Sequence, residues 1–378
     1  MIPRTLYSED HEIFRGMVAK FFEKEVVPHH DQWERDGLVP LEFWRKAGQA
    51  GILCCDMPEE YGGGGADFKM AAIVNEEQAR LNISGPNFAV HSDIVAPYVF
   101  HFGSEDQKQT WLPKMASGEC VGAIAMTEPG TGSDLQGVKT RAVMDGNQYV
   151  INGSKTFISN GQNCGFVIVV AKTDPDKGAH GTSLFIVEDG REGFARGRNL
   201  EKIGLHAQDT SELFFEDVRV PPENMLGQEG QGFAQLMQEL PRERLLIAIG
   251  AVSNAEAGLQ WTIDYTRERK AFGKAISEFQ NTRFKLAEMK AELALARVFV
   301  DKCIDLLNTG DLDVESAAIA KLTCSELQCR VLDECLQLHG GYGYMREYPI
   351  ARAWADARVQ RIYGGTSEIM KELISRTL

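Results

Sequence analysis

The spacing of apolar residues changes twice along this chain of 378 residues, which predicts three structural regions. In residues 1–120 the apolar positions recur three and four apart, as in EDHEIFRGMVAKFFEKEVV, and this spacing is typical of amphipathic helices. From residue 121 to about 229 the pattern becomes short β-branched and aromatic runs separated by Gly, Asn and Asp. The segment MDGNQ is a strong hairpin signal, so this stretch predicts an antiparallel β domain.

Helical spacing returns after the segment PPENMLGQEGQG and continues to the C-terminus. It predicts a short final helix preceded by four long ones, at roughly 230–268, 276–308, 312–339 and 346–361. The order helices, strands, helices favours a helical protein with a β insert over an alternating βαβ fold. We therefore predict a mainly α protein with a central antiparallel β domain, divided into domains 1–120, 121–229 and 230–378.

Composition narrows the range of partners and compartments. A net charge of -14 argues against a nucleic-acid binder, because such a protein needs a basic surface. No apolar run approaches the ~20 residues of a membrane-spanning helix, which predicts no stable membrane insertion. The N-terminal stretch MIPRTLYSEDHEIF resembles neither a signal peptide nor a transit peptide, so we expect a cytoplasmic protein. Eight scattered cysteines without a C-x-x-C pair predict reduced thiols and no metal site.

A pair of glycines near the C-terminus, in RIYGGTSEIMKEL (361–373), precedes what is predicted to be a short helix. Thr366 and Ser367 are favourable N-cap residues for that helix. The Gly-Gly step lets the backbone approach a ligand closely, and the helix N-terminus offers unpaired N–H groups to an anion. The pattern predicts a binding turn but leaves open whether it holds a reacting group.

Four other segments contain candidate binding residues. In AMTEPGTGSDLQG (125–137), Gly130, Gly132 and Ser133 suit a pyrophosphate or a polar ring edge, although a plain hairpin loop explains them equally well. In KTFISNG, Phe157 and Ser159 suit a flat cofactor, whereas aromatic residues in strands usually belong to the core. RERKAFGKAISEFQNTRF (267–284) and QLHGGYGYMREYP (337–349) are each also explained as a helix end followed by a loop.

The segment QELPRERLLIA (238–248) contains one acidic residue with two interpretations. Pro241 fits the first turn of a helix, where Glu243 would interact favourably with the helix dipole. If the Glu243 side chain instead entered an apolar pocket, its pKa would rise and it would suit a general base. Periodicity alone does not separate the two.

Almost end to end, the sequence resembles the acyl-CoA dehydrogenases. The sharpest matches are AMTEPGTGSDLQG (125–137) and QLHGGYGYMRE (337–347) continuing to Asp356, with Thr131 where a smaller residue is usual. MQELPRERLLIA, RKAFGK and IYGGTSEIMKELISR are most similar to the long-chain branch. The resemblance implies an N-terminal helical domain, a central β-barrel and a C-terminal four-helix bundle.

The resemblance also implies FAD, bound between the β domain and the bundle. Phe157 stands where many members have Trp, and the stretches at 269–280 and 337–341 match positions that reach the FAD of a neighbouring subunit. The implied cofactor residues are Ile124, Met126, Thr127, Gly132, Ser133, Phe157, Ile158, Ser159, Arg269, Phe272, Gln280, Gln337, Leu338, His339, Gly340, Gly341, Thr366, Ser367 and Glu368.

The family resemblance also indicates where the catalytic base lies. Most relatives have it immediately after the Tyr of IYGGT, where this chain has Gly364. The long-chain and isovaleryl branches have it instead at the position of Glu243. We therefore predict that Glu243 is the base and that Gly364 marks its absence from the turn.

The implied substrate-binding residues surround these two positions: Ser133, Pro241, Arg242, Arg244, Tyr363, Gly364 and Gly365. Chain length would be set between the segment 87–99 and the start of the 230–268 helix. Asp93 stands where long-chain relatives tend to have a small residue, and the sequence leaves open whether it faces the pocket.

The expected reaction is α,β-dehydrogenation of a medium to long fatty acyl-CoA to the trans-2-enoyl-CoA in β-oxidation. Electrons would pass to an electron-transferring flavoprotein, and sharing FAD between chains implies a homotetramer built as a dimer of dimers. The alternatives are an acyl-CoA oxidase, which usually has an added C-terminal domain, a branched short-chain (isovaleryl-type) dehydrogenase, and a non-catalytic scaffold that binds acyl-CoA or flavin.

Overall fold

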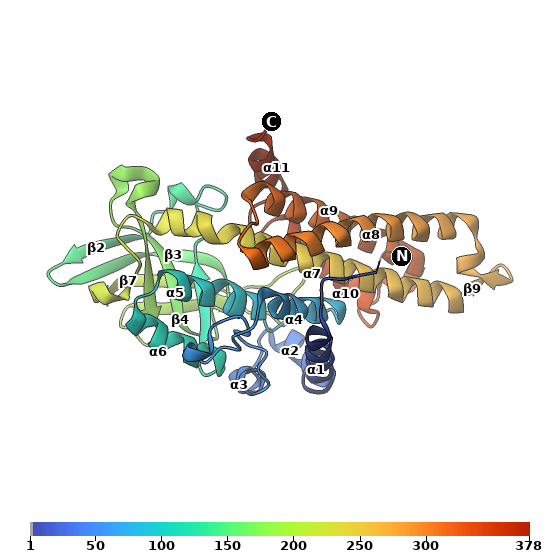
Figure 1. The fold of residues 1–378 in the computed structure, drawn as a ribbon, viewed down its shortest axis with the longest axis horizontal. Coiled ribbons are helices and arrows are strands. Elements are labelled where there is room, and N and C mark those ends of the chain that lie inside the picture. The colour runs from blue at the N-terminus through green and yellow to red at the C-terminus, as the bar shows by residue number, and fades with distance from the viewer. Residues whose placement is uncertain (1–2) are drawn as a thin grey trace.

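The computed structural model describes residues 3–378, and its first region is helical (Figure 1). A π-helical segment, Ala89–Val95, leads directly into α5. The α-helices of this region are α1 (Glu9–Glu25), α2 (Val27–Asp36), α3 (Leu41–Gln49), α4 (Phe68–Arg80), α5 (Ala96–Phe102) and α6 (Glu105–Ala116).

An eight-stranded sheet forms the middle region, with strand order β6-β7-β3-β2-β4-β5-β8 and β1 paired to β4. Most pairs are antiparallel as predicted, but β1 and β4 run parallel, and so does the single contact of β2 with β4. The strands are β1 (Val121–Ala125), β2 (Arg141–Asp145), β3 (Gln148–Ser159), β4 (Cys164–Lys172), β5 (Thr182–Glu188), β6 (Phe194–Asn199), β7 (Thr210–Val220) and β8 (Met225–Leu226).

The last region is helical again, and α7 runs from the β domain to the opposite end of the molecule (Figure 1). There a short hairpin, β9 (Lys270–Ala271) and β10 (Lys274–Ala275), connects it to α8. The helices are α7 (Gly232–Glu268), α8 (Gln280–Thr309), α9 (Val314–His339), α10 (Pro349–Ala357) and α11 (Ser367–Ser375).

Two details differ from the sequence prediction. Pro241 lies inside α7 and not in its first turn, because the helix already begins at Gly232. The predicted helix 346–361 is shorter, since α10 covers Pro349–Ala357 and a 3-10 turn follows over Arg358–Arg361.

The largest core cluster joins the N-terminal helices to α7. Phe22, Trp44 and Ile73 of the first region pack in one cluster with Leu245 and Ile249 of α7. This packing fixes α4 and α7 side by side, which defines two walls of the site described below.

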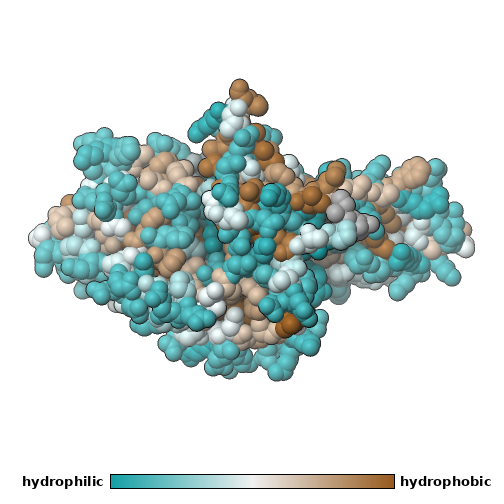
Figure 2. Space-filling model, in the orientation of Figure 1, coloured by the Kyte–Doolittle hydropathy of each residue, from teal (hydrophilic) through white to brown (hydrophobic). Residues whose placement is uncertain are grey.

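The outer face in Figure 2 is mostly hydrophilic, with apolar residues gathered near the base of α11. None of the helices within residues 3–378 is long and apolar enough to cross a membrane. All eight cysteines are free thiols, and seven of them are buried.

Candidate functional site

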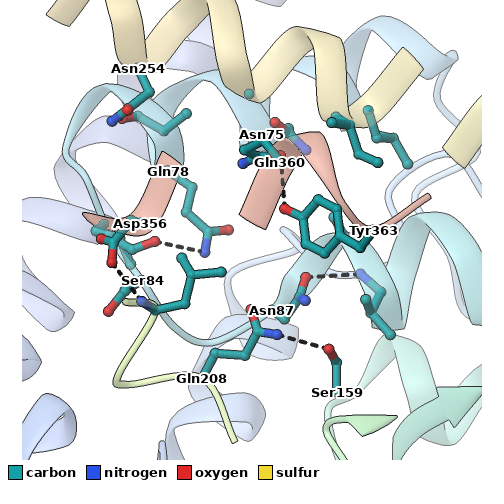
Figure 3. Close-up of a pocket in the computed structure, with 18 of the residues that line it drawn as sticks. Asn75, Gln78, Ser84, Asn87, Ser159, Gln208, Asn254, Asp356, Gln360 and Tyr363 are labelled. Atoms are coloured by element: carbon teal, nitrogen blue, oxygen red, sulfur yellow. Dashed lines mark hydrogen bonds between the residues drawn. The ribbon is translucent and has the colours of Figure 1, made fainter. Parts of the chain in front are cut away.

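A cavity of about 270 Å³ lies between α4, the π-helical segment, α7 and the turn before α11 (Figure 3). It brings together four of the residues predicted from sequence: Glu243, Tyr363, Gly364 and Ser159. Its volume lies near the lower limit for small-molecule sites.

Glu243 is buried on the cavity wall, with 7% of its surface exposed. Burial raises the pKa of its carboxyl to about 7, opposed by the Tyr98 hydroxyl and reinforced by the charge of Glu239. Tyr98 donates to Glu243 Oε1 at 3.0 Å. Among residues 3–378 no donor contacts Oε2, so one carboxyl oxygen remains available to a ligand in the cavity.

The Gly364–Gly365 turn borders the cavity beside α7 and requires glycine. Both residues have positive φ, 64° and 94°, a region that residues with side chains rarely occupy. A Cβ at Gly364 would lie 2.4 Å from Ile247 Cδ1 on α7. The turn is therefore packed against α7 with no space for a side chain unless Ile247 moves.

Two buried cations hold the carbonyl groups of this turn. Lys321 Nζ donates to the Gly365 carbonyl at 2.6 Å, and Arg244 Nε donates to the Gly364 carbonyl at 3.4 Å. Burial lowers the pKa of Lys321 to about 8, with a further contribution from Arg244. Neither cation forms an ion pair with a carboxylate in the described part of the chain. Positive charge is thus concentrated behind the turn.

Other polar groups around the turn are fixed by neighbours. Tyr363 Oη donates to Gln360 Oε1 at 2.8 Å, and burial raises the pKa of this phenol. Gln208 donates to Ser159 Oγ at 2.8 Å, at the β-domain side of the cavity (Figure 3). Thr366 caps α11 as predicted, accepting from the Ile369 N–H at 3.3 Å.

Arg242 does not line the cavity, although it was predicted to contact substrate. Its guanidinium donates to Asp56 Oδ2 at 2.6 Å and to the Asp93 carbonyl at 2.8 Å, and it lies over the ring of Phe68. Arg242 is therefore ion-paired with Asp56, and the Asp93 carboxyl, whose pKa burial raises, lies 3.8 Å away. Asp93 lies beside Arg242 in this cluster and is not among the residues that line the cavity.

On the β domain, the loop after β1 is anchored by a buried ion pair. Glu128 accepts from Lys155 Nζ at 2.9 Å and from the N–H groups of Lys139 and Thr140. Beyond it, Gly132 and Ser133 are exposed at the loop tip, and a Cβ at Gly132 would meet no atom within 4 Å. The anchored loop thus presents backbone groups to an open space.

Phe157 is 67% exposed although it lies in a strand. Its φ of 60° falls in the left-handed region, at an irregularity in the pairing of β3 with β7. The next residue, Ile158, is buried in the sheet core and so does not offer its side chain to a ligand. An exposed aromatic ring on a strained strand suits a flat ligand stacked on it.

The residues that were predicted to reach a neighbouring subunit lie at the far end of the helical bundle, near β9 (Figure 1). Phe272 is 96% exposed there. His339 differs from the others because it is buried, stacks on Tyr265 at 4.3 Å and pairs with the Cys335 carbonyl. The exposed members of this group are Arg269, Phe272, Gln280, Gln337, Gly340 and Gly341.

Sequence reasoning missed Tyr98, Lys321 and several amides of the cavity floor. The charged Lys321 inside the small apolar run AAIAKLTC was a usable signal, because a lysine on a buried helix face needs an acceptor. Tyr98 carried no such signal in the sequence, since a Tyr in a helix usually belongs to the core.

Comparison with known proteins gives matches over the whole chain. The N-terminal, middle and C-terminal domain models of acyl-CoA dehydrogenases match residues 8–119, 123–218 and 230–378. The long-chain specific acyl-CoA dehydrogenase, mitochondrial, of Sus scrofa is 55% identical over 99% of this chain and 88% of its own length.

Two solved structures show the same fold. An acyl-CoA dehydrogenase from Geobacillus kaustophilus has a TM-score of 0.98 and 48% identity, covering 99% of each chain. A glutaryl-CoA dehydrogenase from Mycobacterium smegmatis, solved in complex with FADH2, has a TM-score of 0.90 and 29% identity over 98% of this chain and 95% of its own.

Proposed function

Because the chain belongs to the acyl-CoA dehydrogenase family, and is therefore an oxidoreductase, we propose that it uses FAD to oxidise a medium- to long-chain fatty acyl-CoA to the trans-2-enoyl-CoA. The observation that carries this proposal is the buried carboxyl of Glu243, which lines the same cavity as the side-chain-free turn at Gly364. The electrons would leave to an electron-transferring flavoprotein, in fatty-acid β-oxidation.

The residues present fit FAD. The exposed ring of Phe157 suits stacking, Ser159 supplies a hydroxyl beside it, and the N-terminus of α11 at Thr366 suits an anionic group. The open loop at Gly132 and Ser133 would contact the rest of the cofactor. When bound, the flavin would accept the β-hydrogen of the substrate as hydride.

Glu243 would take the α-proton. With a pKa of about 7 the carboxyl is partly ionised at neutral pH and basic enough to accept a proton from carbon next to a thioester. Tyr98 holds one oxygen, so the free Oε2 would face the α-carbon. Burial excludes water, which strengthens every polar interaction of the reacting groups.

The Gly364–Gly365 turn would stabilise the negative charge that develops on the thioester oxygen. Neither glycine N–H has a hydrogen-bond partner among the described residues, so both are available as donors. Arg244 holds the Gly364 carbonyl, which belongs to the same peptide as the Gly365 N–H, and Lys321 holds the Gly365 carbonyl; their positive charges favour an enolate-like transition state nearby.

Chain length and assembly belong to the same proposal. Along α7 the cavity extends from Glu243 past Gly250 to Asn254, eleven residues and about 16 Å at the rise of a helix, which favours a long chain over a short branched one.

The exposed Phe272 at the far end of the bundle supports a cofactor site shared with a second copy in a homotetramer. A cytoplasmic location stays a prediction.

Anaerobic bleaching of the yellow holoenzyme tests the function. A panel of straight and branched acyl-CoAs of graded length is added without oxygen, and the flavin absorbance is followed. We expect bleaching that is fastest with medium to long straight chains. Fastest bleaching by a short branched chain would support the isovaleryl alternative, and no bleaching by any acyl-CoA would contradict the proposed reaction in favour of a scaffold.

A further inference from the structure

The part of the cavity farthest from Glu243 is polar, which is unusual for a site that buries a hydrocarbon chain. Near Glu243 the walls are apolar, with Val90 and Ile94 facing Leu246 and Ile247. Toward Asn254 the lining changes to amides and a carboxyl, contributed by α4, α7, α9, α10 and the segment that follows α4 (Figure 3). They are Asn75, Gln78, Asn82, Asn254, Gln328 and Asp356.

A directed chain of hydrogen bonds crosses this polar end. Asn82 Nδ2 donates to Asp356 Oδ2 at 3.2 Å, so its own oxygen faces away and accepts from Asn254 Nδ2 at 2.9 Å. Asn254 Nδ2 also donates to the Ala79 carbonyl at 3.0 Å. Gln328 Nε2 then donates to Asn254 Oδ1 at 2.9 Å. Because the Ala79 carbonyl can only accept, Asn254 Nδ2 must be the donor, and this fixes the direction of the chain through Asn254 to Gln328.

The chain ends on an acceptor that lacks a donor. Gln328 is 2% exposed and lines the cavity, and its Oε1 has no hydrogen-bond partner among the described residues. Reversing the amide would place its NH2 where the acceptor now is, and would bring two oxygens together at Asn254. The missing partner must therefore be a hydrogen-bond donor. Leaving such a carbonyl against a methyl group costs about 1–3 kcal/mol.

We propose that this end of the cavity binds a hydroxyl group carried near the end of the acyl chain. The inference rests on the proposed function and specifies its substrate class as acyl-CoAs with a terminal hydroxyl. The hydroxyl is a neutral donor and would donate to Gln328 Oε1. An anionic chain end is disfavoured at Gln328, since Oε1 can only accept and an anion has no proton to donate to it. Dehydrogenation occurs at the α and β carbons and leaves the hydroxyl unchanged.

The test compares three series of acyl-CoAs on the holoenzyme: unsubstituted, ω-hydroxy and ω-methoxy chains of the same graded lengths. The second-order rate constant of anaerobic flavin bleaching is measured for each. At the length whose hydroxyl reaches Gln328, we expect the ω-hydroxy chain to exceed both others about 5- to 10-fold, the value of one net hydrogen bond. The ω-methoxy chain has the oxygen but no donor, so this comparison needs no variant.

Gln328→Met removes the carbonyl and should abolish the preference, whereas the matched wall variant Ile94→Val should keep it. The proposal is overturned if the wild type bleaches no faster with ω-hydroxy than with unsubstituted and ω-methoxy chains at every length, as expected when a water serves Gln328. It is also overturned if a folded Gln328→Met enzyme keeps the preference. Absence of bleaching in all three series would instead contradict the proposed dehydrogenation.

Discussion

Two buried carboxyl groups, Glu243 and Asp356, line the same cavity, and burial raises the pKa of each to about 7. Their hydrogen bonds differ. Both oxygens of Asp356 accept bonds, from the Leu205 N–H at 2.5 Å and from Asn82 at 3.2 Å, whereas within residues 3–378 Glu243 accepts one bond only, from Tyr98. A raised pKa alone therefore does not identify a base. A free oxygen that faces the reacting part of the cavity does, and only Glu243 has one.

The largest effect is expected when the catalytic carboxyl is moved from position 243 on α7 to position 364 on the turn. Glu243→Gly with Gly364→Glu places it on the turn, and we expect partial recovery over Glu243→Gly alone. The Cβ at 364 would lie 2.4 Å from Ile247 Cδ1 and the residue would keep a left-handed φ. Adding Ile247→Ala should therefore raise the bleaching rate of the double variant by about 10-fold, since removing a clash of 1–2 kcal/mol has this effect.

The matched control is Glu243→Gly with Ile247→Ala, which enlarges the cavity without supplying a carboxyl and should stay inactive. Equal recovery in that control would show that space, and not the position of a base, limits the reaction. No recovery in the triple variant would mean that a carboxyl at 364 does not reach the α-carbon in this pocket.

Removing the Tyr98 hydroxyl is a smaller change, and it tests whether Tyr98 sets the pKa of Glu243. Its hydroxyl stabilises the ionised carboxylate, so Tyr98→Phe should raise the pKa of Glu243 and move the acidic limb of the bleaching rate to higher pH. We expect a shift of about one pH unit, with full rate restored at alkaline pH, because one net hydrogen bond has about this value. The measurement is the pH profile of the free holoenzyme with one good substrate.

Glu239→Gln is a control variant that should shift the same pH profile in the opposite direction. The Glu239 charge raises the pKa of Glu243, so its removal should move the limb to lower pH. Shifts of the same sign in Tyr98→Phe and Glu239→Gln would show that the limb reports a group other than Glu243.

Much of the fold followed from the sequence, because periodicity reports local burial. The bounds of α7 at Gly232–Glu268 agree closely with the predicted 230–268. Pro241 was misplaced, since the helix rule for proline describes first turns, and here tertiary packing of α7 holds a proline inside the helix. The parallel pairing of β1 with β4 was missed because strand order depends on contacts between distant segments.

The site was less accessible to sequence reasoning. Glu243 and Gly364 are 121 positions apart, and only the family resemblance related them; the structure places both on one cavity. Arg242 has the same charge and neighbourhood in the sequence as Arg244, but the helix turns Arg242 toward Asp56 and Arg244 toward the Gly364 carbonyl. The chain from Asp356 to Gln328 joins residues from three helices and one connecting segment, and no local pattern predicts it.

The central claim is that Glu243, and not Asp356, removes the α-proton. Anaerobic stopped-flow bleaching of the holoenzyme by one saturating acyl-CoA tests it in Glu243→Gln and Asp356→Asn side by side. We predict that Glu243→Gln binds flavin normally but bleaches at least about 10³-fold more slowly, within the range of general-base catalysis. Asp356→Asn should unfold at a lower temperature yet bleach within about 3-fold of wild type once folded, because its role is hydrogen bonding. Full bleaching by Glu243→Gln would contradict the account.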